Sequence, residues 1–121
     1  MIKKKAVAAL AALFVSFSFS SSVLAYGAIA VDDEQGESEP GFGFATGEDS
    51  QDAAKRAALK QCRESGNDHC KVAVWFKACG AYAASKKYYG YGFGDSKAIA
   101  TKKALEMCGR NQCQVVVAEC E

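Results

Sequence analysis

The sequence predicts an α+β fold: two tandem β-β-α-β repeats that form one mainly antiparallel sheet, with two helices packed on one face and disulfides as cross-links. Three observations predict it. The chain after residue 25 contains the same series of motifs twice, each series includes an alanine-rich helical segment, and all six cysteines lie in this part. The length of 121 residues suits one compact domain and argues against a multidomain enzyme.

Residues 1–25 are typical of a secretory signal peptide. Three consecutive lysines precede an apolar segment, Ala6–Phe17, which is shorter than the roughly 20 residues needed to cross a bilayer. Val23 and Ala25 then fit a small-residue cleavage site, which would leave Tyr26 as the first residue. We therefore expect a secreted or periplasmic protein with no stable membrane anchor after cleavage.

The predicted single domain, residues 26–121, divides into repeat one, residues 26–79, and repeat two, residues 80–121. Five features recur in the same order, and the segments that connect them are shorter in repeat two. The matches are Gly27–Ala30 with Gly80–Ala83, Phe42–Phe44 with Tyr91–Phe93, Ser50–Cys62 with Ser96–Cys108, Cys70–Val72 with Cys113–Val115, and Cys79 with Cys120. Duplication explains this order better than chance.

Each repeat predicts three strands. The first strands are expected at the apolar runs Ala28–Val31 and Ala81–Ala84. The second strands follow where aromatic residues alternate with glycine, so that one face is aromatic and the other almost bare. The third strands, Val72–Phe76 and Val115–Ala118, are continuous β-branched and aromatic runs, which we expect at the buried centre of the sheet.

A helix is expected between the second and third strands of each repeat. Its small buried stripe would let the helix approach the sheet closely. The predicted stripes are Ala54, Ala57, Ala58, Gln61 and Cys62 in repeat one, and Ala100, Ala104, Met107 and Cys108 in repeat two. The candidate N-caps are Asp49, Ser50, Asp95 and Ser96, and the glycines that mark the helix ends are Gly66 and Gly109.

The six cysteines are expected to form three disulfides, because an even number in a small exported domain indicates a disulfide framework. The preferred pairing closes one loop in each repeat and leaves one bridge to tie the repeats together. Its pairs are Cys62–Cys70, Cys108–Cys113 and Cys79–Cys120. The leading alternative joins Cys70 to Cys113 between repeats. Metal binding is not expected, because the tightest cysteine spacing is wider than C-x-x-C.

Four segments together resemble a known bacterial family. They are Tyr26–Ala30, the helix that ends at Cys62, Cys70–Val72 and Cys79–Ala83. In combination they are similar to domain-of-unknown-function family 4189, over nearly all of residues 26–121. The resemblance implies a small exported protein with no established catalytic residues and no established ligand.

Charge is segregated along the predicted domain. Residues 26–54 hold eight acidic residues and no basic one, whereas residues 55–121 hold twelve basic and six acidic residues. Two surfaces of opposite charge favour a protein partner, and nucleic acid is not expected. Asp32–Pro40 is expected to form a solvated hairpin loop and not a calcium site, because the acid spacing does not follow a helix–loop–helix site. Gly41–Gly47 lacks the Lys-Ser/Thr ending of a phosphate-binding loop.

A candidate binding surface lies in repeat two, where two cations precede a run of tyrosines. Such a group can bind polyanions or stack on sugar rings. The alternative, which we favour, is a hairpin with the lysines at its tip and the tyrosines packed in the core. A concave site lined by Tyr88, Tyr89 or Trp75 would favour binding. The candidate residues are Lys86, Lys87, Tyr88, Tyr89 and Tyr91.

We expect a non-catalytic binding module without a cofactor, in the cell envelope or outside the cell. One alternative is an inhibitor or immunity protein against an envelope hydrolase such as lysozyme, which would meet the acidic segment. Another is a small hydrolase that uses carboxylates such as Glu48, Asp49 or Glu119. The one histidine, His69, is expected in an exposed loop, because its neighbour Asp68 does not create the geometry of a catalytic triad.

Overall fold

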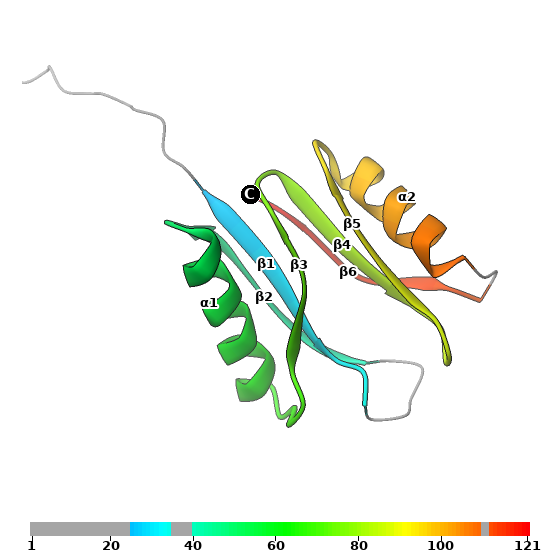
Figure 1. Ribbon diagram of the computed structural model, residues 1–121, viewed down its shortest axis with the longest axis horizontal. Helices are drawn as coiled ribbons and strands as arrows, with labels where there is room; N and C mark the ends of the chain where they lie inside the picture. The colour runs from blue at the N-terminus through cyan, green and yellow to red at the C-terminus, as the bar shows by residue number, and fades with distance from the viewer. Residues whose placement is uncertain (1–24, 35–39, 110–111) are drawn as a thin grey trace, which may run out of the picture.

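The computed structural model describes residues 25–34, 40–109 and 112–121, so the predicted signal peptide lies outside the described residues except for Ala25. Two series of strand, strand, helix and strand follow one another (Figure 1). The elements are β1 Tyr26–Asp32, β2 Gly41–Glu48, α1 Gln51–Glu64, β3 Lys71–Phe76, β4 Cys79–Ala84, β5 Tyr89–Gly94, α2 Lys97–Cys108 and β6 Gln114–Cys120. The two halves share this order of elements, and their origin by duplication stays a prediction.

The strands form two three-stranded antiparallel sheets, with the orders β2-β1-β3 and β5-β4-β6. The sheets face each other and the helices cover their outer faces, so the layers run α1, first sheet, second sheet, α2 (Figure 1). The expected single sheet with both helices on one face is therefore wrong. The third strands, expected at the centre, are edge strands, and the first strands β1 and β4 are central.

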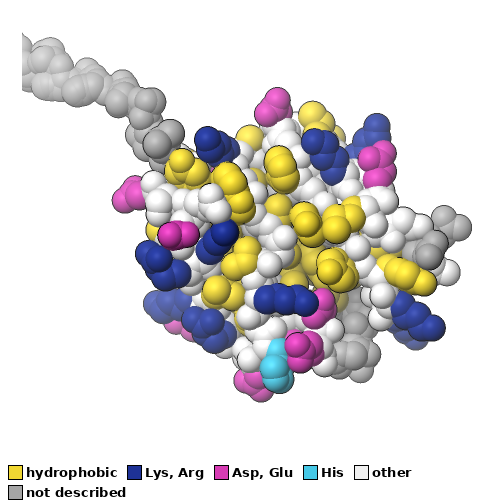
Figure 2. All heavy atoms as spheres, in the orientation of Figure 1, with side chains coloured by type: hydrophobic (Ala, Val, Ile, Leu, Met, Phe, Trp, Pro, Cys, Tyr) yellow, Lys and Arg dark blue, Asp and Glu magenta, His cyan; other side chains and the backbone are white. Residues whose placement is uncertain are grey.

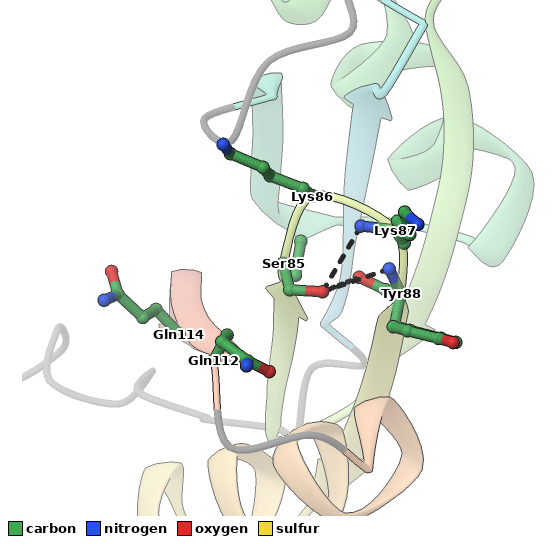
Figure 3. Close-up of a pocket in the computed structure, with 7 residues that line it drawn as sticks. Ser85, Lys86, Lys87, Tyr88, Gln112 and Gln114 are labelled. Atoms are coloured by element: carbon green, nitrogen blue, oxygen red, sulfur yellow. Dashed lines mark hydrogen bonds between the residues drawn. The ribbon is translucent and has the colours of Figure 1, made fainter.

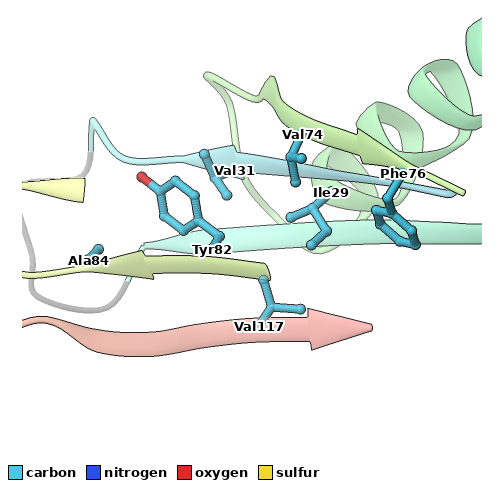
Figure 4. Close-up of a cluster of buried hydrophobic side chains, with 7 residues drawn as sticks. All are labelled: Ile29, Val31, Val74, Phe76, Tyr82, Ala84 and Val117. Atoms are coloured by element: carbon cyan, nitrogen blue, oxygen red, sulfur yellow. The ribbon is translucent and has the colours of Figure 1, made fainter. Parts of the chain in front are cut away.

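The chain forms two sheets with a helix on each outer face because the central strands β1 and β4 are apolar on both faces. Their larger residues fill the space between the two sheets, where Ile29 from β1 and Tyr82 from β4 are both buried (Figure 4). Their alanines, such as Ala28 and Ala81, pack instead against the helices. Strands covered on both faces read as continuous apolar runs, so the sequence pattern did not separate one sheet from two.

Close approach of each helix depends on a glycine in the strand beneath it. An ideal Cβ at Gly43 would lie 2.2 Å from the backbone nitrogen of Cys62, and one at Gly90 would lie 2.3 Å from the carbonyl oxygen of Ala104. The bare faces of β2 and β5 thus receive the helices. The buried stripes are narrower than expected and consist of Ala54, Ala58 and Cys62 in α1, and Ala100, Ala104 and Cys108 in α2.

Serine begins both helices. The Ser50 hydroxyl accepts a hydrogen bond from the Ala53 N–H at 3.0 Å, and the Ser96 hydroxyl accepts one from Ile99 at 3.1 Å. Gly109 ends α2 in the left-handed conformation, with φ of 72°. None of the described helices is long and apolar enough to cross a membrane.

Three disulfides cross-link the chain, and their pairs are those of the preferred set. Cys62–Cys70 and Cys108–Cys113 each join a helix end to the strand that follows. Cys79–Cys120 lies within the second sheet, because these residues are register partners on β4 and β6, with Cα atoms 4.0 Å apart. Cys79 ends the predicted repeat one and Cys120 lies in repeat two, so the bridge joins the predicted repeats, but both cysteines belong to the second sheet and the bridge does not cross-link the two sheets.

Candidate functional site

The predicted binding surface occupies the β4–β5 hairpin. Ser85 builds the hairpin tip: its backbone N–H donates to the Tyr88 carbonyl at 2.8 Å, and its hydroxyl accepts the backbone N–H groups of Lys87 at 3.4 Å and Tyr88 at 3.1 Å (Figure 3). The turn leaves Lys86 and Lys87 exposed. Neither lysine forms an ion pair with another described residue.

The tyrosines do not pack into the core as the favoured interpretation expected. Tyr88, Tyr89 and Tyr91 are 43%, 49% and 38% exposed. The glycines of β5 face α2, so its aromatic side chains point to the opposite side of an edge strand. The Tyr89 ring stacks on the ring of Tyr82, with centroids 6.0 Å apart.

Two hollows flank the hairpin tip. The first, of about 630 Å³, is lined by the tip residues together with Gln112 and Gln114 (Figure 3). The second, of about 240 Å³, lies beside the end of the space between the sheets, and we call it the hairpin crevice. Its walls include Asp33, Pro40, Tyr82, Tyr88, Tyr89 and the two tip lysines.

The Tyr82 side chain places a polar hydroxyl in the hydrophobic cluster between the two sheets. This side chain is 1% exposed, and its hydroxyl has no hydrogen-bond partner in the described part of the chain. Burial raises the pKa of Tyr82 well above its usual range, and the nearby groups Asp33 and Tyr89 raise it further. Tyr82 therefore remains a neutral hydrogen-bond donor throughout the physiological pH range.

A third hollow, of about 510 Å³, lies where the two halves meet, and we call it the junction groove. Its apolar lining comes from Trp75 and Phe76 of β3, Phe93 of β5 and Ile99 of α2. Its charged lining residues are Lys77, Asp95 and Lys103. The Lys103 ammonium lies 5.6 Å from the centroid of the Phe93 ring, an arrangement that holds the cation over the aromatic face.

The exposed large hydrophobic side chains of the described residues lie mostly in the second half, and two of them, Phe93 and Ile99, line this groove. Of those in the described residues only Phe42 belongs to the first half. Met107, expected in the buried stripe of α2, is 49% exposed. Its sulfur accepts a hydrogen bond from the backbone N–H of Tyr91 at 3.4 Å. Figure 2 shows hydrophobic side chains gathered near the centre of one face, with Lys and Arg side chains around them. The exposed large hydrophobic residues of the second half, besides Met107, are Tyr88, Tyr89, Tyr91, Phe93, Ile99, Leu105 and Val115.

Asp32 was expected in a solvated loop but is buried. Its carboxylate accepts the backbone N–H groups of Glu34 at 3.0 Å and His69 at 3.1 Å, so it fastens the end of β1 to the loop before β3. The His69 side chain is exposed. Residues 35–39 of the acidic segment lie outside the described residues. Within the described residues, no group of three or more His, Cys, Asp or Glu side chains is placed to hold a metal ion.

The other sequence candidates are dispersed. Glu48 is partly buried at the end of β2, Asp49 is exposed after it, and Glu119 is partly buried on β6. No hydrogen bond or ion pair between described residues joins these carboxylates. Gly41–Gly47 forms most of strand β2 and is not a loop.

Comparison with known proteins identifies a family and relatives whose names state no activity. The family model described as "Domain of unknown function (DUF4189)" matches residues 26–120. Protein Mb1300c of Mycobacterium bovis and Proteins MT1307 and Rv1269c of Mycobacterium tuberculosis are each 44% identical over 57 residues. That alignment covers 47% of this chain and 44% of each relative, so the chain matches less than half the length of these curated proteins. No solved structure matches.

Proposed function

The chain belongs to the family described as Domain of unknown function (DUF4189), and on this premise we propose that it is a non-catalytic binding module that holds a protein partner outside the cytoplasm. The observation that carries the proposal is the junction groove. An exposed apolar hollow bordered by charges is the usual form of a binding site on a small soluble domain. The three disulfides of the chain support its location in an oxidising compartment, where such bridges persist.

The groove fits an apolar side chain presented by the partner. Trp75, Phe93 and Ile99 offer two aromatic rings and a branched aliphatic group, the residue types that form the centre of protein interfaces. Phe93 and Ile99 are 56% and 42% exposed, so burying them against a partner would remove a substantial apolar area from water.

Charge indicates which partner surface fits. Lys77 and Lys103 line the groove, and Asp95 is the one acidic residue in its described lining. We therefore propose a partner whose inserted aromatic or aliphatic residue is flanked by carboxylates, since opposite charges at an interface rim accelerate and orient association.

Capture from an envelope or culture-supernatant extract tests this function. The oxidised protein is immobilised as wild type, as Phe93→Ser and as Phe42→Ser; the last removes an exposed ring from the corresponding strand of the first half. A partner retained by wild type and Phe42→Ser, but lost by Phe93→Ser, is the expected result. A partner lost equally from both variants, or from neither, would contradict the groove as the binding site.

A second candidate is inhibition of an envelope hydrolase such as lysozyme. The eight acidic residues without a basic one in residues 26–54 favour this candidate, because a basic enzyme would bind there instead of at the groove. An assay of lysozyme activity with micromolar protein separates the two candidates. Inhibition that is retained in Phe93→Ser supports binding of the enzyme by the acidic segment, whereas full enzyme activity in the presence of the protein rules out the inhibitor function.

A further inference from the structure

We propose that the hairpin crevice is a second binding site, which takes one sugar ring bearing a carboxylate, as in a uronic acid. This site is separate from the junction groove and does not depend on the protein partner proposed above. It combines a buried hydrogen-bond donor, a carboxylate, exposed aromatic rings and two cations around one small hollow.

The buried Tyr82 hydroxyl points to a ligand. A buried polar atom without a partner costs free energy, and such atoms are rare in folded proteins. The hydroxyl belongs to a residue that lines the crevice, with Asp33 in the same lining. A sugar hydroxyl placed between them would accept the Tyr82 O–H and donate to the Asp33 carboxylate, and so satisfy both groups.

The exposed rings supply the apolar part of the recognition. Tyr88 and Tyr89 line the crevice and are nearly half exposed, so either ring can cover the C–H face of a sugar. Tyr89 is already held parallel to Tyr82 by stacking, at an interplanar angle of 19°. A ring held in this way loses little conformational freedom when a ligand binds.

The tip lysines determine the charge of the ligand. Lys86 and Lys87 line the crevice, are exposed, and have no ion pair within the described residues. Asp33, in contrast, is paired with Lys71 at 3.5 Å, so the negative charge in the crevice is already partly compensated. The remaining positive charge favours a carboxylate on the sugar.

Size and access agree with a single ring. The volume of about 240 Å³ is below the range typical of pockets for drug-sized ligands, roughly 300–1,000 Å³. The Tyr82 hydroxyl is covered in the free protein, but exposed side chains that line the crevice with it, such as Lys86 and Lys87, change rotamer within nanoseconds. A ligand can therefore reach the hydroxyl without a change in the fold.

Isothermal titration of the oxidised protein with trigalacturonic acid, a uronic-acid trimer, tests the site. Its fully methyl-esterified form serves as the neutral control ligand. We expect the acid to bind and the ester to bind at least tenfold more weakly. The double variant Lys86→Gln/Lys87→Gln should bind the acid as weakly as wild type binds the ester. No heat with the acid, or equal binding of acid and ester, would overturn the proposal.

Tyr82→Phe is the decisive variant because it removes only the hydroxyl. We expect at least a tenfold loss of affinity for the acid, since a site built to donate a hydrogen bond discriminates strongly by that bond. The melting temperature of the free variant should equal or exceed that of wild type, because the hydroxyl has no partner to lose among the residues that the structure describes. Tyr91→Phe is the matched control: Tyr91 is the register partner of Tyr82 and lies outside the crevice lining.

These two measurements separate a ligand site from a structural hydroxyl. Unchanged affinity of Tyr82→Phe for the acid would overturn the proposal. So would a lower melting temperature of the free variant, because the hydroxyl would then have a permanent partner such as a buried water.

Discussion

The Phe76 ring occupies a slot between two glycine backbones. An ideal Cβ at Gly27 would lie 2.4 Å from its Cε1 atom, and one at Gly80 would lie 2.2 Å from its Cδ2 atom. Gly27 lies in β1 and Gly80 in β4, so one buried ring contacts the central strands of both sheets. The sequence motif that recurs in the two halves predicted both strands, but nothing in it indicated that a residue 49 positions after Gly27 would fill the slot.

Gly80→Ala should therefore destabilise the protein. We expect a loss of about 1–3 kcal/mol in the free energy of unfolding, because the added methyl group overpacks a buried aromatic ring. Urea denaturation measures it. Combining the substitution with Phe76→Leu, which vacates part of the slot, should cost less than the sum of the two single changes. Strict additivity would show that the methyl group does not meet the ring.

At the scale of elements, local signals predicted most of the structure. Both helices begin at one of the expected caps and all six strands include their expected residues, because capping and apolar runs depend on neighbours in sequence. The pairing of strands into sheets was missed, because β1 and β4 are apolar on both faces. The one local signal was the alternation of small and large side chains in Ala28-Ile29-Ala30-Val31. The small side chains of this strand pack against a helix and the large ones pack against the other sheet.

The two N-caps give a prediction for matched elements. Ser50→Ala and Ser96→Ala should each lower the free energy of unfolding by about 1 kcal/mol, because each removes the acceptor for a backbone N–H at a helix start. Thermal denaturation followed by circular dichroism detects the change. Replacement by Asp keeps the acceptor and should retain most of the stability; an equal loss with Asp would mean that the hydroxyl bond is not the cause.

The disulfides differ in the length of chain that each closes. Loss of Cys79–Cys120, with a sequence separation of 41, should cost about 4 kcal/mol, whereas loss of Cys108–Cys113, with a separation of 5, should cost about 2 kcal/mol. The paired substitutions to alanine, compared by urea denaturation, measure this difference. A larger loss from the short bridge would show that local packing outweighs restriction of the unfolded chain.

For the whole molecule, both proposed binding sites are hollows that the four-layer arrangement creates. Trp75 and Phe93 line one groove although they lie 18 residues apart in separate sheets, and Asp33 and Tyr82 line one crevice at a separation of 49 residues. The sequence indicated the tyrosines and lysines of the hairpin as a candidate surface. It could not predict that Tyr82, in an apolar run, would carry a hydroxyl with no hydrogen-bond partner in the described part of the chain, because that depends on which strand packs opposite.

Site-specific photo-cross-linking most directly tests the central claim that the junction groove holds a protein partner. A photoreactive phenylalanine analogue is placed at position 93, in the groove, or at position 42, on the corresponding strand of the first half. Both side chains are exposed, so both probes are accessible in the free protein. Irradiation in the extract should join the partner to the protein at position 93 and not at position 42. Adducts of equal yield at both positions, or at position 42 alone, would contradict the account.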